Sequence, residues 1–193
     1  MEFEPRKNDA ETEKDEKMEK LRSQQETLSR LGKSSLDFYI FGGWAGKIEG
    51  AYGDDYYPSD IDIYIDQYQL EDWKRFFDSE NFSIKEQDDK LQIVDQKTGA
   101  YIDGHLFKDE KGHYVEQTSY GTFQLPKTGF EKKILDNSAV NVMRPELSYI
   151  IERGGPLRPG KDDKIRSLEG VLDQEYLKEI EREFKYTSPE QSE

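Results

Sequence analysis

The chain contains no cysteine. Disulfide bonds, zinc sites built on thiolates and catalysis by a thiol are therefore excluded. Long apolar runs are also missing, because no stretch approaches the roughly 20 apolar residues that a membrane-spanning helix needs. The first stretch, "MEFEPRKNDAETEKDEKMEK", is charged throughout and lacks the apolar core of a secretion signal. We therefore expect a cytoplasmic protein that does not enter membranes.

Positive charge is scarce relative to negative charge. Lys and Arg together number 28 and Asp and Glu together number 42, so the formal net charge is −14. Such an acidic surface repels phosphate backbones, which argues against general nucleic-acid binding. It favours a neutral or cationic partner, although acidity also serves solubility alone. Hydrophobic residues make up 33% of the chain and aromatic residues 12%, which is enough for one folded domain with a core.

Helical and extended patterns alternate along the chain. We predict a disordered tail over residues 1–9, a domain over residues 10–172 that includes an N-terminal helix, and a C-terminal helix with a loose tail over residues 173–193. The element order predicts an α/β or α+β fold, with a mixed β-sheet flanked by helices and helical N- and C-terminal segments. The N-terminal helix has a narrow apolar stripe and should pack weakly. This stripe consists of Met18, Leu21, Leu28 and Leu31.

The stretch "SDIDIYID" places two carboxylates on a predicted strand. Its isoleucines alternate with polar residues, so Asp60 and Asp62 project together from the opposite face. Carboxylates this close repel each other, and one stays protonated unless a cation lies between them. Mg²⁺ prefers such oxygen ligands and completes its shell with substrate phosphates. An exposed strand face is the alternative, and for an isolated Asp-x-Asp motif it is the more frequent explanation.

A third carboxylate lies in "AYIDGHLF", where Asp103 interrupts an otherwise apolar strand. On a strand beside the Asp-x-Asp strand, it would complete a cradle for metal ions. Taken alone, it is also compatible with the end of a strand or with a turn.

A pair of glycines, Gly42 and Gly43, separates a predicted strand from a short predicted helix. Glycine allows backbone N–H groups to approach phosphate oxygens, and a helix N-terminus favours anions. The chain has neither a Gly-x-Gly-x-x-Gly fingerprint nor a P-loop sequence. A plain strand-to-helix turn is the alternative for this pair.

Together, "FGGWAGKIEG", "SDIDIYID" and "YIDGHLF" resemble the nucleotidyltransferase superfamily of the polymerase-beta type. That superfamily combines a Gly-Gly turn, an Asp-x-Asp strand and a third Asp on a later strand. The Trp after the glycines is similar to the lincosamide nucleotidyltransferases and aminoglycoside adenylyltransferases, and "RPGKDDKIRSL" resembles a helix start near the end of their domain. The likeness spans residues 38–172. That group usually carries Arg or His shortly before Asp-x-Asp, where this chain has "GDDYYPSDID".

The resemblance implies a Mg²⁺-dependent enzyme that moves a nucleoside monophosphate from ATP or another NTP to a hydroxyl group of a small molecule, antibiotics included. It implies that Asp60 and Asp62 hold Mg²⁺ and that Asp103 binds a second metal ion or acts as the general base. The acidic balance of the chain favours a cationic acceptor.

The resemblance also implies which residues bind the nucleotide. Gly42 and Gly43 would contact its phosphates, and Lys161 would pair with a phosphate. A solvated lysine at a helix start is the alternative for Lys161.

Two other functions remain open at this point. The first is a toxin-like nucleotidyltransferase that acts on a protein or a tRNA, although the acidity opposes tRNA. The second is a non-catalytic domain that binds a nucleotide or a partner protein. The missing basic residue favours this second function, and the three carboxylates oppose it. The sequence identifies neither the acceptor, nor the preferred NTP, nor the oligomeric state.

Overall fold

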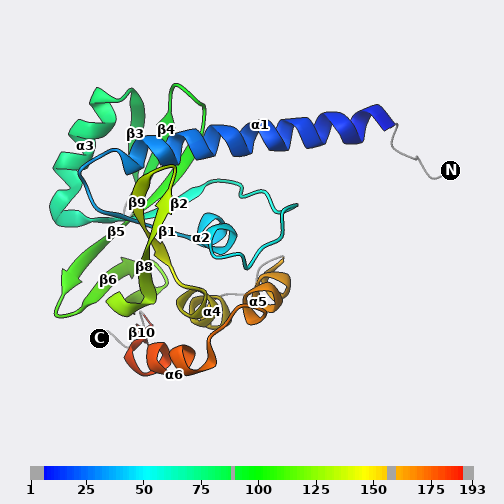
Figure 1. Ribbon diagram of the computed structural model, residues 1–193. Coiled ribbons are helices and arrows are strands. Elements are labelled where there is room, and N and C mark those ends of the chain that lie inside the picture. The colour runs from blue at the N-terminus through cyan, green and yellow to red at the C-terminus, as the bar shows by residue number, and fades with distance from the viewer. Residues whose placement is uncertain (1–6, 88–89, 156–159, 189–193) are drawn as a thin grey trace.

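One mixed β-sheet organises the molecule, and helices flank it (Figure 1). The computed structural model describes residues 7–87, 90–155 and 160–188. The helices are α1 (Lys7–Gly32), α2 (Gly42–Ile48), α3 (Leu70–Ser79), α4 (Pro145–Gly154), α5 (Lys161–Glu169) and α6 (Gln174–Glu183). The strands are β1 (Phe38–Phe41), β2 (Ile61–Asp66), β3 (Phe82–Gln87), β4 (Lys90–Asp95), β5 (Tyr101–Glu110), β6 (His113–Thr118), β7 (Gly121–Pro126), β8 (Phe130–Leu135), β9 (Ser138–Met143) and β10 (Lys185–Thr187).

The strand order along the sheet is β10-β7-β6-β5-β2-β1-β9-β8, and the β3–β4 hairpin joins through β4 to β5. The pairs β2–β5 and β1–β9 are parallel, whereas the other pairs are antiparallel. The predicted mixed sheet with flanking helices is therefore confirmed. No helix among the described residues is long and apolar enough to cross a membrane.

The apolar face of β2 forms the centre of the core. Ile61, Ile63 and Ile65 are all fully buried, as the alternation in the sequence predicts. Trp73 and Phe77 of α3 are also fully buried and belong to the same apolar cluster. Burying a side chain of this size contributes about 1.5–3 kcal/mol. The core thus fixes the orientation of β2 and turns its polar residues towards the opposite face.

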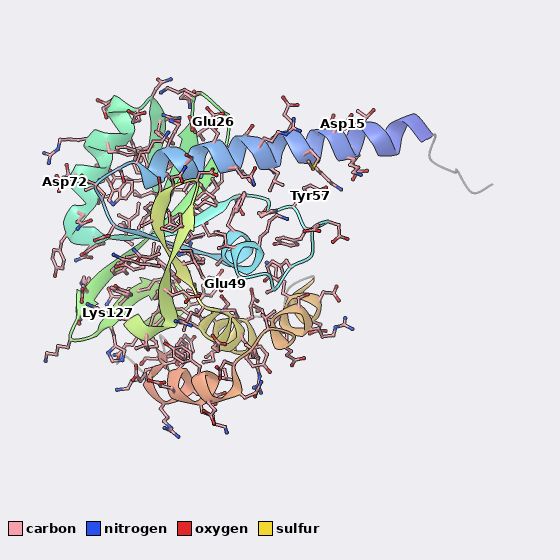
Figure 2. All side chains as sticks on the ribbon, in the orientation of Figure 1. Asp15, Glu26, Glu49, Tyr57, Asp72 and Lys127 are labelled. Atoms are coloured by element: carbon pink, nitrogen blue, oxygen red, sulfur yellow. The ribbon has the colours of Figure 1, made fainter. Side chains whose placement is uncertain are left out.

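The long helix α1 divides into an exposed part and a buried part. Its first half extends beyond the sheet (Figure 1), and Figure 2 shows Asp15 on this part with Tyr57 beneath the helix. Leu28 and Leu31, near the other end, are fully buried. The prediction of weak packing is therefore wrong for the last turns, because the sheet covers the C-terminal end of the stripe.

A buried ion pair fastens α1 to the β3–β4 hairpin. Nη1 of Arg30 lies 2.5 Å from Oδ1 of Asp95, whose side chain is fully buried. Thr27 donates a hydrogen bond of 2.8 Å to the other oxygen of this carboxylate. Burial alone would raise the pKa of Asp95, but hydrogen bonds from Thr27, the backbone of Lys97 and Arg30 together hold it below its usual value. The carboxylate is therefore charged and depends on these partners.

We expect the Arg30→Met substitution to lower the free energy of unfolding by about 3 kcal/mol, because it leaves the buried charge of Asp95 without its cation. Urea unfolding monitored by circular dichroism measures the change. Arg22→Met, at an exposed position of the same helix, is the matched control. Equal stabilities of the two variants would contradict the anchoring role of the ion pair.

Both ends of the chain differ from the prediction. Helix α1 begins at Lys7 rather than Ala10, while residues 1–6 and 189–193 of the predicted tails lie outside the described residues. Ile180 of α6 is fully buried in the main core, so the last helix belongs to the domain. Tyr186 and Thr187, predicted to be loose, form β10 with Lys185 by pairing with β7.

Strand β8 lies at the end of the strand order, next to β9. It forms a hairpin with β9 through Asp136 and Asn137, which both have positive φ. Asn and Asp tolerate this backbone conformation, which makes such two-residue turns possible.

Candidate active site

A cavity of about 610 Å³ opens near the beginning of β2 and β5. It collects side chains from the sheet, from the loop before β2, and from α4 and α5. Its lining is mostly polar or aromatic. The residues that line it are Phe41, Gly42, Tyr52, Ser59, Asp60, Asp62, Tyr64, Lys90, Asp103, His105, Glu116, Thr118, Tyr120, Phe123, Met143, Ser148, Ile151, Glu152 and Lys164.

The three predicted carboxylates all face this cavity. Asp62 and Asp103 are directly opposite each other in the parallel β2–β5 pair, and Asp60 immediately precedes β2. Residues paired in register project from the same face of a sheet. The Asp60 carboxylate accepts a hydrogen bond of 2.7 Å from the Ser59 hydroxyl. The sheet register thus brings together Asp62 and Asp103, which are far apart in the sequence.

Asp62 is the carboxylate whose charge is least compensated. Burial raises its pKa to about 6, and repulsion from Asp60 adds to this effect more than repulsion from Asp103 does. A cation held by Asp60 and Asp62 would remove that cost. One or two carboxylates together with substrate phosphates are the usual ligands of Mg²⁺, so this pair fits the ion that the sequence resemblance implies.

Asp103 is paired with cationic side chains. Lys90 donates a hydrogen bond of 2.8 Å to its Oδ2, and Nε2 of His105 lies 3.5 Å from the same oxygen. Burial alone would raise the pKa of Asp103, but the bonds from His105 and Lys90 outweigh burial and lower it to about 2. Among the residues that the structure describes, no group of three or more acidic or histidine side chains is arranged to hold a metal ion.

His105 is held in place from the interior of the sheet. Its Nδ1 lies 2.5 Å from Oε1 of Glu116, and the Tyr64 hydroxyl donates a hydrogen bond of 2.9 Å to the other oxygen of Glu116. Burial would lower the pKa of His105, but its bonds with Asp103 and Glu116 raise it to about 9. At neutral pH both ring nitrogens therefore carry protons, one directed to each carboxylate.

Gly42 is required by the position of Asp62. It begins α2 with a φ of 62°, a conformation that side chains rarely adopt, and a Cβ atom there would overlap the Asp62 carboxylate. Gly43 has a different role. A Cβ atom on Gly43 would lie 2.8 Å from the Tyr56 hydroxyl and 3.3 Å from Pro58, and Gly43 does not line the cavity.

Lys161 lies outside the cavity lining. Its ammonium group donates a hydrogen bond to the Gly155 carbonyl, and the residue is 7% exposed. The geometry therefore does not support the predicted contact between Lys161 and a phosphate, and the alternative of a solvated lysine is wrong. Lys164, one helical turn later, lines the cavity and lowers the pKa of Asp62 slightly.

Lys90, Glu116 and Lys164 were not predicted as site residues. The spacing in "KDDK" offered a signal for Lys164, because residues three apart on a helix are neighbours. Lys90 and Glu116 reach the site only through strand pairing with β5, which the local pattern does not encode.

The mixed sheet with its flanking helices is the fold of a nucleotidyltransferase. The family model described as aminoglycoside-2''-adenylyltransferase matches residues 25–166. The chain belongs to this family, and it is a nucleotidyltransferase of the antibiotic-resistance type. No curated protein sequence matches the chain at a significant level.

Two solved structures have a similar fold. The lincosamide antibiotic adenylyltransferase LnuA, bound to lincomycin, has a TM-score of 0.61 and 14% identity, covering 78% of this chain and 97% of LnuA. ANT(2'')-Ia in complex with adenylyl-2''-tobramycin has a TM-score of 0.58 and 12% identity, covering 86% of this chain and 95% of that protein. At these identities the similarity establishes the fold alone.

Proposed function

We propose that the protein transfers AMP from ATP, in a Mg²⁺-dependent reaction, to a hydroxyl group of a small cationic antibiotic. The observation that carries this proposal is the meeting of Asp60, Asp62 and Asp103 in one cavity, in a chain of the adenylyltransferase family. A reaction that consumes ATP fits the expected location in the cytoplasm.

The nucleotide would bind beside Asp60 and Asp62. Mg²⁺ bound to these carboxylates and to the phosphates would neutralise the phosphate charge. The ammonium group of Lys164 would pair with the phosphates from the α5 side. Gly42 also lines the cavity. Because it has no side chain, the Asp62 carboxylate can occupy the space beside it and face the site.

Asp103 would act on the acceptor. Its carboxylate accepts the hydrogen bond of the acceptor hydroxyl and directs the oxygen at the α-phosphorus. A bond forms between this oxygen and the α-phosphorus, the bond from the α-phosphorus to the bridging oxygen breaks, and pyrophosphate leaves with the bonding electrons. The hydroxyl proton passes to Asp103 and then to solvent. The transition state of phosphoryl transfer is loose, so the attacking oxygen has formed little of its new bond when the transition state is reached. The hydroxyl proton therefore becomes acidic only late along the reaction, and a weak base suffices.

The charge of the cavity supports a cationic acceptor. Five carboxylates line it, against two lysines and one histidine. These carboxylates are Asp60, Asp62, Asp103, Glu116 and Glu152. With one Mg²⁺ bound, the nucleotide and the cavity together still carry net negative charge, which attracts an amine-bearing molecule. The structures of LnuA and ANT(2'')-Ia contain lincomycin and adenylyl-2''-tobramycin, which makes both antibiotics suitable probes.

We expect Lys164→Met to weaken the binding of a non-hydrolysable ATP analogue by about tenfold, the usual effect of losing one charge-assisted contact. Lys161→Met is the matched control on the same helix. It should lower stability, because the Gly155 carbonyl loses its partner, and leave nucleotide affinity unchanged. Calorimetric titration measures both affinities. A larger loss of affinity in Lys161→Met would overturn the assignment of Lys164.

A pyrophosphate-release screen tests the function directly. It combines Mg²⁺, each of the four NTPs and a library of hydroxyl-bearing molecules that includes aminoglycosides and lincosamides. We expect release only with ATP and an amine-bearing antibiotic. Release that requires a protein or a tRNA would favour a toxin-like transferase, and tight ATP binding without release on any acceptor would favour a non-catalytic domain.

A further inference from the structure

One carboxylate oxygen of Asp103, Oδ2, is contacted by two basic side chains of the protein. Nζ of Lys90 and Nε2 of His105 both approach Oδ2 of Asp103, at 2.8 Å and 3.5 Å. The three carboxylates that the sequence predicts as one metal site therefore fall into two groups. Asp60 and Asp62 form one acidic pair, and Asp103 is part of a separate cluster with compensated charge.

The Lys90 contact is built into the sheet. Lys90 begins β4 and is directly opposite His105 in the antiparallel β4–β5 pair, while Gln92 is opposite Asp103. Lys90 thus reaches Asp103 along the diagonal of the ladder, a distance that long side chains span. The hydrogen-bonded strands fix the spacing of the two residues, so the ion pair does not depend on a loop.

The His105 contact is equally fixed. Glu116 holds the other ring nitrogen, and Glu116 is itself held by Tyr64; these two residues are only 5% and 4% exposed. The imidazole ring cannot turn away from Asp103 without breaking a buried hydrogen bond. Oδ2 of Asp103 is consequently enclosed by two groups that carry protons.

We propose that this site takes a single divalent cation, on Asp60 and Asp62, and that the ammonium group of Lys90 occupies the place beside Asp103 that a second metal ion would otherwise take. This inference rests on the proposed function. Lys90 would supply a single positive charge next to the attacking hydroxyl, without ligand exchange. The reaction would then need only one metal ion bound in the active site.

Native mass spectrometry of the full chain can count the ions. The protein is loaded with Mn²⁺ and an ATP analogue that has a methylene group between the α- and β-phosphorus atoms. We expect one Mn²⁺ per chain in the wild type and two in Lys90→Met, because the substitution removes the ammonium group that occupies the place of the second ion beside Asp103. In Lys90→Met/Asp103→Asn the count should return to one. Lys85→Met, at an exposed position of the adjacent strand β3, is the control and should also bind one.

Two Mn²⁺ ions in the wild type would overturn this inference and leave the proposed function intact. One ion in both the wild type and Lys90→Met would overturn the role given to Lys90. No bound Mn²⁺ in any of the proteins would contradict the inference and the proposed function together. Thermal melts of each variant establish that the counts come from folded protein.

Discussion

Asp62→Asn should reduce transferase activity by at least about 100-fold, equivalent to about 2.7 kcal/mol, and should make the metal-free protein more stable than the wild type. The substitution keeps the shape of the side chain and removes a charge. In the wild type this charge lies beside Asp60 and is poorly solvated, which raises the pKa of Asp62 to about 6. Removing it relieves the repulsion and takes away a ligand for Mg²⁺.

The gain in stability should depend on pH in one direction. The pKa of Asp62 is about 6 in the folded protein and 3.8 in an unperturbed aspartate, so the folded state binds the proton more tightly. The stability that comes from this proton is present below pH 3.8 and is lost as the pH rises through 6. The variant should therefore exceed the wild type by on the order of 2 kcal/mol at pH 7.5, and by much less at pH 4.5.

Urea unfolding at both pH values, with and without Mg²⁺ and ATP, measures these effects. Ligand at 100 times its Kd should stabilise the wild type by about 2.7 kcal/mol and should stabilise Asp62→Asn far less. Asp54→Asn, in the exposed loop before the site, removes the same charge and should behave like the wild type. An unchanged Mg²⁺–ATP stabilisation in Asp62→Asn would refute a metal role for Asp62.

Gly42→Ala should reduce activity about as severely as Asp62→Asn, although it removes no chemical group. Gly42 has a φ of 62°, and an added methyl group would overlap the carboxylate of Asp62. The backbone strain should cost about 1 kcal/mol, and displacement of Asp62 should cost the metal site. Activity assays and thermal melts with and without Mg²⁺ and ATP measure the two effects.

Gly50→Ala separates strain from displacement. Gly50 has a similar φ of 73°, but an added Cβ atom there meets no other atom within 4 Å. Gly50→Ala should therefore lose a similar amount of stability to backbone strain and keep its activity. Equal activities in the two glycine variants would show that the close approach of Gly42 to Asp62 has no functional role.

Local patterns sufficed for the elements whose burial is periodic. The alternation in "DIDIYID" identified β2 and its buried isoleucines. The same alternation identified the face that carries Asp62. These features follow from side-chain direction along one segment, which the sequence encodes directly.

Contacts that depend on the pairing of strands far apart in the sequence could not be predicted from such local patterns. Lys90 contacts Asp103 because β4 pairs with β5, and Glu116 reaches His105 because β6 pairs with the other half of that strand. The register of these pairs is set by the whole sheet. Lys161 was assigned from a motif, whereas in the structure it is buried and bonds to the Gly155 carbonyl, and Lys164 lines the cavity.

The most direct test of the proposed transfer is the mass of the product. The full chain is incubated with ATP and Mg²⁺ and with tobramycin or lincomycin, and the antibiotic is then examined by mass spectrometry. We expect an antibiotic heavier by one adenylyl group, formed with one equivalent of pyrophosphate, and no such product with Asp62→Asn. Transfer of a phosphoryl group in place of an adenylyl group, or an equal yield from Asp62→Asn, would contradict it.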